Sequence, residues 1–165
     1  QGHEKIALLC SHKNDVSIGA LRLTGYKKAL EAHNIPVDER RIRYMDPELD
    51  SYSMKSGYRM TKSLLEYGVD CTAFFAIADS LAIGAVRALI DAGKRVPEDI
   101  SVAGFDGTEM AAYYNPSITT IRQPAETMAR ETIKLLFDSI KKKTNVQQLI
   151  FEGELVPGES VKKLN

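Results

Sequence analysis

The fold is decided by residues 72–93, whose sequence is TAFFAIADSLAIGAVRALIDAG. The segment Thr72-Ala-Phe-Phe-Ala-Ile77 is short and apolar on both faces, which predicts a strand buried inside a sheet. A helix is predicted from Ser80 to Ala92, and Gly93 ends it. A buried strand that leads directly into a helix is the repeating unit of a parallel α/β sheet.

The same alternation of apolar runs and helical patterns extends in both directions. Further strands are predicted at residues 5–10, 41–45, 100–104, 118–123 and 147–155. Further helices are predicted at residues 16–33, 54–67 and 124–141. Continuous apolar strands that alternate with helices indicate a parallel sheet covered on both faces, so the predicted fold class is α/β, a doubly wound parallel sheet.

Composition and charge limit the classes of function. The 165 residues suggest one domain, and 22 Lys and Arg balance 22 Asp and Glu. A nucleic-acid-binding domain usually carries a basic excess, so direct DNA or RNA binding by this chain is not expected. No apolar stretch is long enough for a membrane helix, and the residues before Lys5 do not resemble a signal peptide. Cys10 and Cys71 lie in separate apolar runs, and we expect reduced core residues rather than a disulfide.

Candidate binding residues follow the predicted strands, because open α/β sheets bind ligands beyond the carboxyl ends of their strands. They are Ser11, His12, Asp46, Ala78, Asp79 and Asp106, with Arg22 as the nearby cation. Simpler roles compete with binding. Asp79 is expected to cap the following helix, with ligand contact as the alternative. Asp46 is expected to be a turn residue and His12 an exposed loop residue, whereas Asp106 could close an Asx turn or contact a ligand.

Common catalytic motifs are absent from the sequence. There is no GxxxxGK[ST] phosphate loop, no GxGxxG after the first strand and no GxSxG nucleophile elbow. Three scattered histidines without a Cys-x-x-Cys pair argue against a zinc site. We therefore predict that the chain is not an enzyme and has no catalytic residue, metal or cofactor.

Several longer motifs point to a known family. They are Phe75–Leu89, the run VPEDISVAGFD at 96–106, the run PSITTIRQP at 116–124, Arg22-Leu-Thr-Gly-Tyr26 and Ser56-Gly-Tyr58. In this order they closely resemble the C-terminal half of the LacI/GalR family of bacterial transcription regulators, from Gly2-His3 to about Ser160. The resemblance implies a periplasmic-binding-protein-like pair of α/β lobes that clamps a small molecule, often a sugar or purine. A helix-turn-helix headpiece precedes these lobes in the family and binds operator DNA in the cytoplasm.

The resemblance also implies a division of the chain. Residues 1–123 would form the C-terminal lobe, residues 124–145 a helix that normally belongs to the N-terminal lobe, and residues 146–165 the return strand and tail. Gly2-His3-Glu-Lys-Ile6 resembles the point where the family chain enters its second lobe. We therefore expect a truncated two-lobe domain whose headpiece and most of whose first lobe lie outside this chain, with operator DNA bound only through that headpiece.

Carried over by motif, Arg22, Tyr52 and Asp106 fall on effector-contacting positions, and their chemistry suits a sugar or another small polar metabolite. Ala78 and Ile18 fall on positions where relatives often carry hydrogen-bonding side chains, which is a departure from a hydroxyl-rich site. The alternative function is a periplasmic or secreted sugar-binding protein of a transport system, which shares the fold.

Two expectations concern surfaces that another segment would cover. The helix at 80–92 is apolar nearly all round, which predicts a partner chain on its second side. The resemblance places Ile83, Arg87 and Tyr114 in the interface of a homodimer. The helix at 124–141 carries an apolar stripe that we expect a neighbouring chain to cover, and an isolated, solvent-exposed helix at 125–140 would contradict this expectation.

Overall fold

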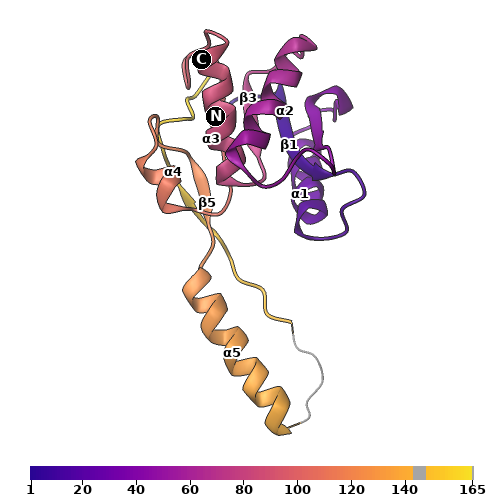
Figure 1. The fold of residues 1–165 in the computed structure, drawn as a ribbon, viewed down its shortest axis with the longest axis vertical. Helices are drawn as coiled ribbons and strands as arrows, with labels where there is room; N and C mark the ends of the chain where they lie inside the picture. The colour runs from indigo at the N-terminus through magenta and orange to yellow at the C-terminus, as the bar shows by residue number, and fades with distance from the viewer. Residues whose placement is uncertain (143–147, 165) are drawn as a thin grey trace.

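A four-stranded parallel sheet organises the body of the molecule in the computed structural model, which describes residues 1–142 and 148–164 (Figure 1). The sheet has the order β2-β1-β3-β4 and is built from β1 (Ile6–His12), β2 (Ile42–Met45), β3 (Ala73–Ala76) and β4 (Ser101–Ala103). Leu8, Leu9 and Phe74 on the central strands are at most 1 % exposed, which explains the uninterrupted apolar runs. The predicted fold class is confirmed.

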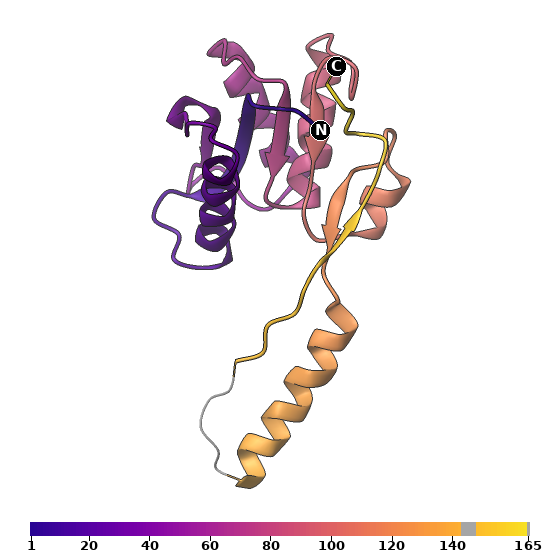
Figure 2. The same ribbon diagram turned by 180° about the vertical axis from the view of Figure 1, so that it is seen from behind.

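The two faces of the sheet are covered unequally. Helix α1 (Ile18–Ala32) packs on one face, whereas α2 (Met54–Glu66) and α3 (Asp79–Asp91) pack side by side on the other (Figures 1 and 2). Right-handed crossovers require this arrangement, because the β1–β2 connection runs toward one edge and the next two connections run toward the other. Among the described helices, α1 is the one that packs on this face of the sheet. Beside it, Phe75 and Ala103 of the sheet line open grooves.

Helices α2 and α3 approach each other backbone to backbone. A Cβ atom on Gly57 would overlap the Leu81 carbonyl, and one on Gly84 would overlap the Met54 carbonyl. This contact covers the second apolar side of α3 within the chain, so Leu81 and Ile83 are 0 % and 3 % exposed. The argument that Leu81 and Ile83 need a partner chain for their burial is therefore wrong, because a neighbouring helix of the same lobe buries them. Ile90 near the end of α3 is 46 % exposed, and the homodimer stays a prediction.

A small second sheet follows the lobe. The short helix α4 (Glu109–Tyr113), which the sequence patterns did not predict, leads to β5 (Thr120–Arg122), and β5 pairs antiparallel with β6 (Glu154–Val156). The last strand is thus much shorter than the predicted 147–155: residues 148–153 form no strand, and Gln147 lies outside the described residues, as do residues 143–146 and 165. The chain leaves and returns to the lobe along this antiparallel pair.

Helix α5 (Ala125–Lys142) projects away from the lobe (Figures 1 and 2). Its apolar side chains Ile133, Leu136, Phe137 and Ile140 are between 55 % and 67 % exposed. The expectation that this stripe would be covered is therefore wrong for the single chain, because its own lobe does not reach it. Among the described residues, no helix combines the length and apolarity needed to cross a membrane.

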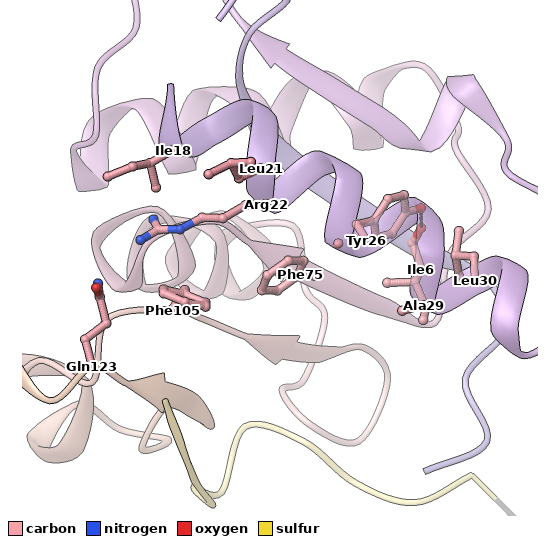
Figure 3. A pocket seen from close by; sticks show the side chains of 11 residues that line it. Ile6, Ile18, Leu21, Arg22, Tyr26, Ala29, Leu30, Phe75, Phe105 and Gln123 are labelled. Atoms are coloured by element: carbon pink, nitrogen blue, oxygen red, sulfur yellow. Dashed lines mark hydrogen bonds between the residues drawn. The ribbon is translucent and has the colours of Figure 1, made fainter. Parts of the chain in front are cut away.

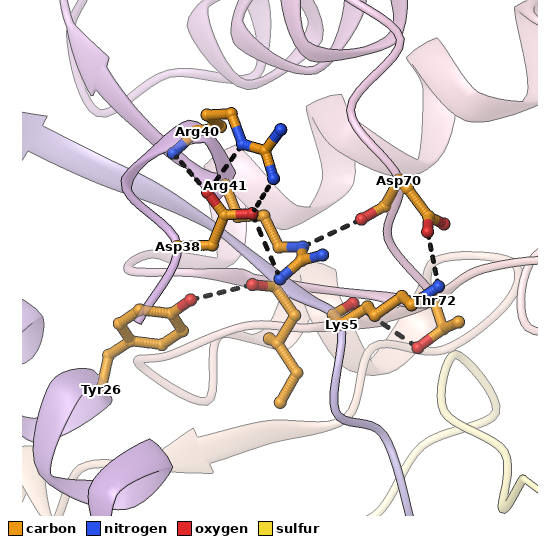
Figure 4. A network of polar contacts seen from close by, with 8 residues as sticks. Lys5, Tyr26, Asp38, Arg40, Arg41, Asp70 and Thr72 are labelled. Carbon is orange, nitrogen blue, oxygen red and sulfur yellow. Dashed lines mark hydrogen bonds and ion pairs between the residues drawn. The ribbon is translucent and has the colours of Figure 1, made fainter. Parts of the chain in front are cut away.

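The amino ends of the strands are tied together by polar contacts (Figure 4). Asp38 accepts from Arg40 at 2.8 Å and caps the 3₁₀ turn η1 (Glu39–Arg41), while Arg41 donates to the Asp70 carbonyl at 2.9 Å. The Tyr26 hydroxyl donates to the Ile6 carbonyl at 2.8 Å, and burial raises the pKa of Tyr26 to about 12. These contacts are at the far end of the sheet from the predicted ligand edge.

Candidate functional site

Arg22 and Asp106 form an ion pair at the carboxyl edge of the sheet. Arg22 lies on α1 and Asp106 follows β4, and Nη2 of Arg22 is 3.2 Å from Oδ1 of Asp106. Nη1 of Arg22 donates to the Ile77 carbonyl, and the guanidinium carbon lies 4.1 Å from the centre of the Phe105 ring. Because the Arg22 side chain is only 13 % exposed, these three contacts fix its orientation.

Gln123 is a second polar partner of Asp106. Its Nε2 donates to the same Oδ1 at 2.7 Å, and its backbone amide donates to the Asp106 carbonyl at 3.2 Å. From the sequence, Gln123 is predicted only as the end of a strand. Its position directly after β5 was the available signal, because strand β5 lies beside the end of β4 through the Asp106–Arg122 bridge.

The backbone of Asp106 is unusual. Its φ is 125°, a region that residues with a side chain rarely adopt and that costs about 1–3 kcal/mol. Such a conformation persists only where the surroundings impose it. Burial raises the pKa of Asp106, although Arg22 and a hydrogen bond from Gln123 act to lower it.

Asp79 does not have either of the roles considered from sequence. It is 0 % exposed, and the N-cap position of α3 is Ala78, with no side-chain capping bond. The Asp79 carboxylate instead accepts from the Thr108 amide at 2.7 Å, the Thr108 hydroxyl at 3.0 Å and the Thr120 hydroxyl at 2.6 Å. The capping interpretation is wrong, and the carboxylate lies beneath the edge rather than on it.

Tyr52 and Ile18 supply apolar surface at this edge. Tyr52 precedes α2 and is 47 % exposed, and its carbonyl accepts from the Ser80 hydroxyl at 3.0 Å. Partial burial raises the pKa of the Tyr52 hydroxyl, with Asp15 acting in the same direction and Arg22 opposing it. Ile18 opens α1 and is 60 % exposed. The structure thus brings Arg22, Asp106 and Gln123 to one edge of the sheet, with exposed apolar side chains nearby.

The other strand-end residues contribute less. Ala78 is 4 % exposed and adds no hydrogen-bonding group. Asp46 accepts from the Glu48 amide at 2.9 Å, which confirms a turn residue. Nδ1 of His12 lies 3.3 Å from the Met45 carbonyl, so this histidine packs against β2 rather than standing free in a loop.

A cavity of about 670 Å³ begins at the Arg22 guanidinium (Figure 3). Arg22, Phe105 and Gln123 form one end of it, and its wall continues between α1 and Phe75 to Tyr26 and Leu30. Apart from Arg22 and Gln123, the lining is apolar or contributed by glycine and tyrosine. The polar groups that could orient a ligand are therefore concentrated at the carboxyl edge.

The chain is similar to known proteins over nearly its whole length. Residues 1–161 match the family model of the periplasmic binding protein-like domain. The HTH-type transcriptional regulator MalR of Clostridium butyricum is 42 % identical over 147 residues, 89 % of this chain and 42 % of MalR. A solved complex of the transcriptional regulator CelR with cellobiose superposes with a TM-score of 0.86 at 36 % identity, covering 96 % of this chain and 47 % of CelR. A LacI family regulator from Enterococcus faecium with bound ribose gives a TM-score of 0.84 at 32 % identity, covering 99 % of this chain and 58 % of that protein.

The chain belongs to the periplasmic binding protein-like domain family, because its sequence matches that family model over residues 1–161. Within that class its sequence and fold match transcriptional regulators over nearly the whole of this chain, among them MalR, CelR and the LacI family regulator from E. faecium. The chain spans about half the length of the curated relatives that it matches.

Proposed function

We propose that this chain is the C-terminal lobe of an effector sensor in a DNA-binding regulator, and that its effector is a sugar or another small polar metabolite. The observation that carries the proposal is the Arg22–Asp106–Gln123 cluster at the carboxyl edge. In open α/β folds this edge is where ligands bind. The DNA-binding headpiece lies outside the chain, and the regulator acts in the cytoplasm.

The chemistry of the cluster favours hydroxyl groups. Both Arg22 and Gln123 bond to Oδ1 of Asp106, and no described residue donates to Oδ2, so Oδ2 can accept from a ligand hydroxyl. The guanidinium and the amide can donate to a neighbouring ligand oxygen, and charge-assisted bonds of this kind contribute about 1.5–3 kcal/mol each. Tyr52 offers an exposed ring for the apolar face of a sugar. Cellobiose in CelR and ribose in the E. faecium regulator support this effector class.

Homodimerisation is part of the proposal. Ile83, Arg87 and Tyr114 line one cavity of about 310 Å³ together with Met54 and Tyr58. A side chain of a second copy would enter this cavity, with Arg87 at its exposed rim and Ile83 at its buried floor. The cavity supports a homodimer interface at this place. Because Ile83 is 3 % exposed, its side chain mainly packs within the lobe.

The effector proposal is tested by NMR titration of the ¹⁵N-labelled chain with cellobiose, ribose and adenine at millimolar concentrations. We expect weak binding, because a clamped effector takes part of its contacts from the other lobe. Shifts should concentrate at Arg22, Tyr52 and Gln123 and vanish in Arg22→Gln. Shifts that survive Arg22→Gln, or that map away from this edge, would contradict the proposal.

The alternative, a periplasmic or secreted sugar-binding protein, shares the fold and the sugar chemistry. Relatives named HTH-type regulators favour the regulator. The coding sequence upstream of Gln1 distinguishes the two, because a helix-turn-helix supports the regulator and a signal peptide supports the transport protein.

A further inference from the structure

Asp79 forms hydrogen bonds to both sides of the turn that contains Asp106. The Asp79 backbone amide donates to the Phe105 carbonyl at 2.8 Å, and its carboxylate accepts from the Thr108 amide at 2.7 Å. The residue before Asp106 and the second residue after it are therefore tied to one buried side chain and its own backbone. The Asp79 side chain does not reach solvent, because the residue is 0 % exposed.

The same carboxylate reaches strand β5 through Thr120. The Thr120 hydroxyl donates to Oδ1 of Asp79 at 2.6 Å and accepts from the Gly107 amide at 3.2 Å. One hydroxyl thus links the buried carboxylate to the residue that directly follows Asp106. Both sides of the turn and the neighbouring strand converge on Asp79.

The glycines around the turn fit this arrangement. Gly104 faces Asp79, and a Cβ atom there would overlap Oδ1 of the carboxylate. Gly107 has a φ of 73°, and a Cβ atom there would collide with Arg122. Gly104 thus leaves room for the Asp79 carboxylate, and the turn has no room for a side chain at Gly107.

We propose that Asp79 is a positioning residue: from beneath the edge it holds the 104–108 turn in the conformation that presents Asp106 to Arg22 and Gln123. The inference deepens the proposed function, on which its meaning for an effector rests, because Asp106 is the carboxylate of that site. It also accounts for the φ of Asp106. The Thr108 amide donates to the Asp79 carboxylate and the Asp79 amide donates to the Phe105 carbonyl, so the backbone is held on both sides of Asp106.

A carboxylate suits this position better than an amide. Three donors point at the two oxygens of Asp79: the amide and hydroxyl of Thr108 and the hydroxyl of Thr120. Asparagine would place an NH₂ group, which cannot accept, opposite at least one of these donors. Either the Thr108 amide then loses its acceptor, or the Thr120 hydroxyl must reverse from donor to acceptor. Asp79→Asn therefore keeps the size of the side chain and removes part of the support for the turn.

The test reads the turn itself in the ¹⁵N-labelled chain. The three-bond coupling between the amide and Hα protons of Asp106 reports its φ, and amide hydrogen exchange reports its opening. Asp50→Asn is the matched control: the Asp50 side chain is 1 % exposed and accepts from Arg59 and the Asp46 amide, away from the 104–108 turn. We expect Asp79→Asn to change the coupling and to speed exchange of the Asp106 and Gln123 amides by at least about tenfold. In Asp50→Asn both should stay as in the wild type.

If Asp79→Asn does not fold, the proposal is tested with Thr120→Val and Thr120→Ser, because only serine keeps the hydroxyl that links Asp79 to Gly107. The valine variant should change the coupling at Asp106 and the serine variant should restore it. Equal behaviour of these two variants, or of Asp79→Asn and Asp50→Asn, overturns the proposal and makes Asp79 an ordinary buried residue. Because this readout needs no ligand, it is independent of the cellobiose titration, whose failure would count against the proposed function alone.

Discussion

Nη2 of Arg22 lies 3.2 Å from Oδ1 of Asp106, although 84 positions separate the two residues in the chain. The pair joins α1 to the turn after β4, and the Arg22 guanidinium also rests on the Phe105 ring and the Ile77 carbonyl. A charged pair oriented before a ligand arrives reduces the ordering that binding requires. This preorganisation is the reason that the edge, rather than the apolar part of the cavity, is expected to determine which effector binds.

Asp106→Asn should separate stability from binding. Burial raises the pKa of Asp106. A carboxyl whose pKa is raised in the folded state contributes stability that is lost as the pH rises through that pKa. At neutral pH the Asn variant should therefore be as stable as the wild type or slightly more stable, and Asn tolerates a positive φ. Binding of cellobiose or ribose, followed by NMR shifts, should weaken by about 10–100-fold. A destabilised variant with unchanged binding would refute this prediction.

The glycine contact between α2 and α3 can be tested against a matched glycine. Gly84→Ala pushes a methyl group into the Met54 carbonyl and should lower the free energy of unfolding by about 1–3 kcal/mol or more. Gly25→Ala on α1 meets nothing within 4 Å and should raise it by about 0.5–1 kcal/mol. Urea denaturation of both variants checks the pair, and similar shifts in the two would rule out close backbone packing as the cause.

Acid should weaken the contacts at the amino edge of the sheet. A hydrogen bond from Arg40 is the main cause that lowers the pKa of Asp38 from 3.8 to about 2. A carboxyl with a lowered folded pKa stabilises the fold above its unfolded pKa and loses that effect as pH falls toward the folded value. Asp38→Asn should flatten the decrease in Tm between about pH 4 and pH 2. If Tm falls equally steeply with pH in the wild type and in Asp38→Asn, Asp38 does not contribute to the acid sensitivity.

The proposed homodimer is tested at Arg87 rather than at Ile83. Because Ile83 is 3 % exposed, Ile83→Asp would bury a charge and destabilise the lobe itself. The Arg87 side chain is 65 % exposed and pairs with Asp91 at 2.9 Å, so Arg87→Glu should leave Tm within about 2 °C of the wild type. Sedimentation should show a wild-type dimer at high micromolar concentration and a more dissociated variant. A monomeric wild type would exclude the interface.

The exposed stripe of α5 should bind apolar probes. Phe137 is 56 % exposed, so Phe137→Glu should reduce the fluorescence of a bound hydrophobic dye without lowering the Tm of the lobe. Ser139→Glu adds the same charge to α5 without removing apolar surface and is the control. A loss of Tm in Phe137→Glu alone would show that α5 is covered in solution, as the sequence pattern first suggested.

The sequence alone determined the alternation of strands and helices, because buried parallel strands need continuous apolar runs such as residues 72–77 and helices end at Gly and Pro. The strand-end positions made Arg22 and Asp106 candidate residues, and the family resemblance added Tyr52. Only the tertiary structure decided what local patterns leave open. The second apolar side of α3 is covered by α2, Asp79 accepts from distant Thr108 and Thr120, and Gln123 reaches Asp106. Each of these contacts joins segments far apart in the chain, and whether a side chain caps, packs or binds depends on which donors the fold brings within about 3 Å.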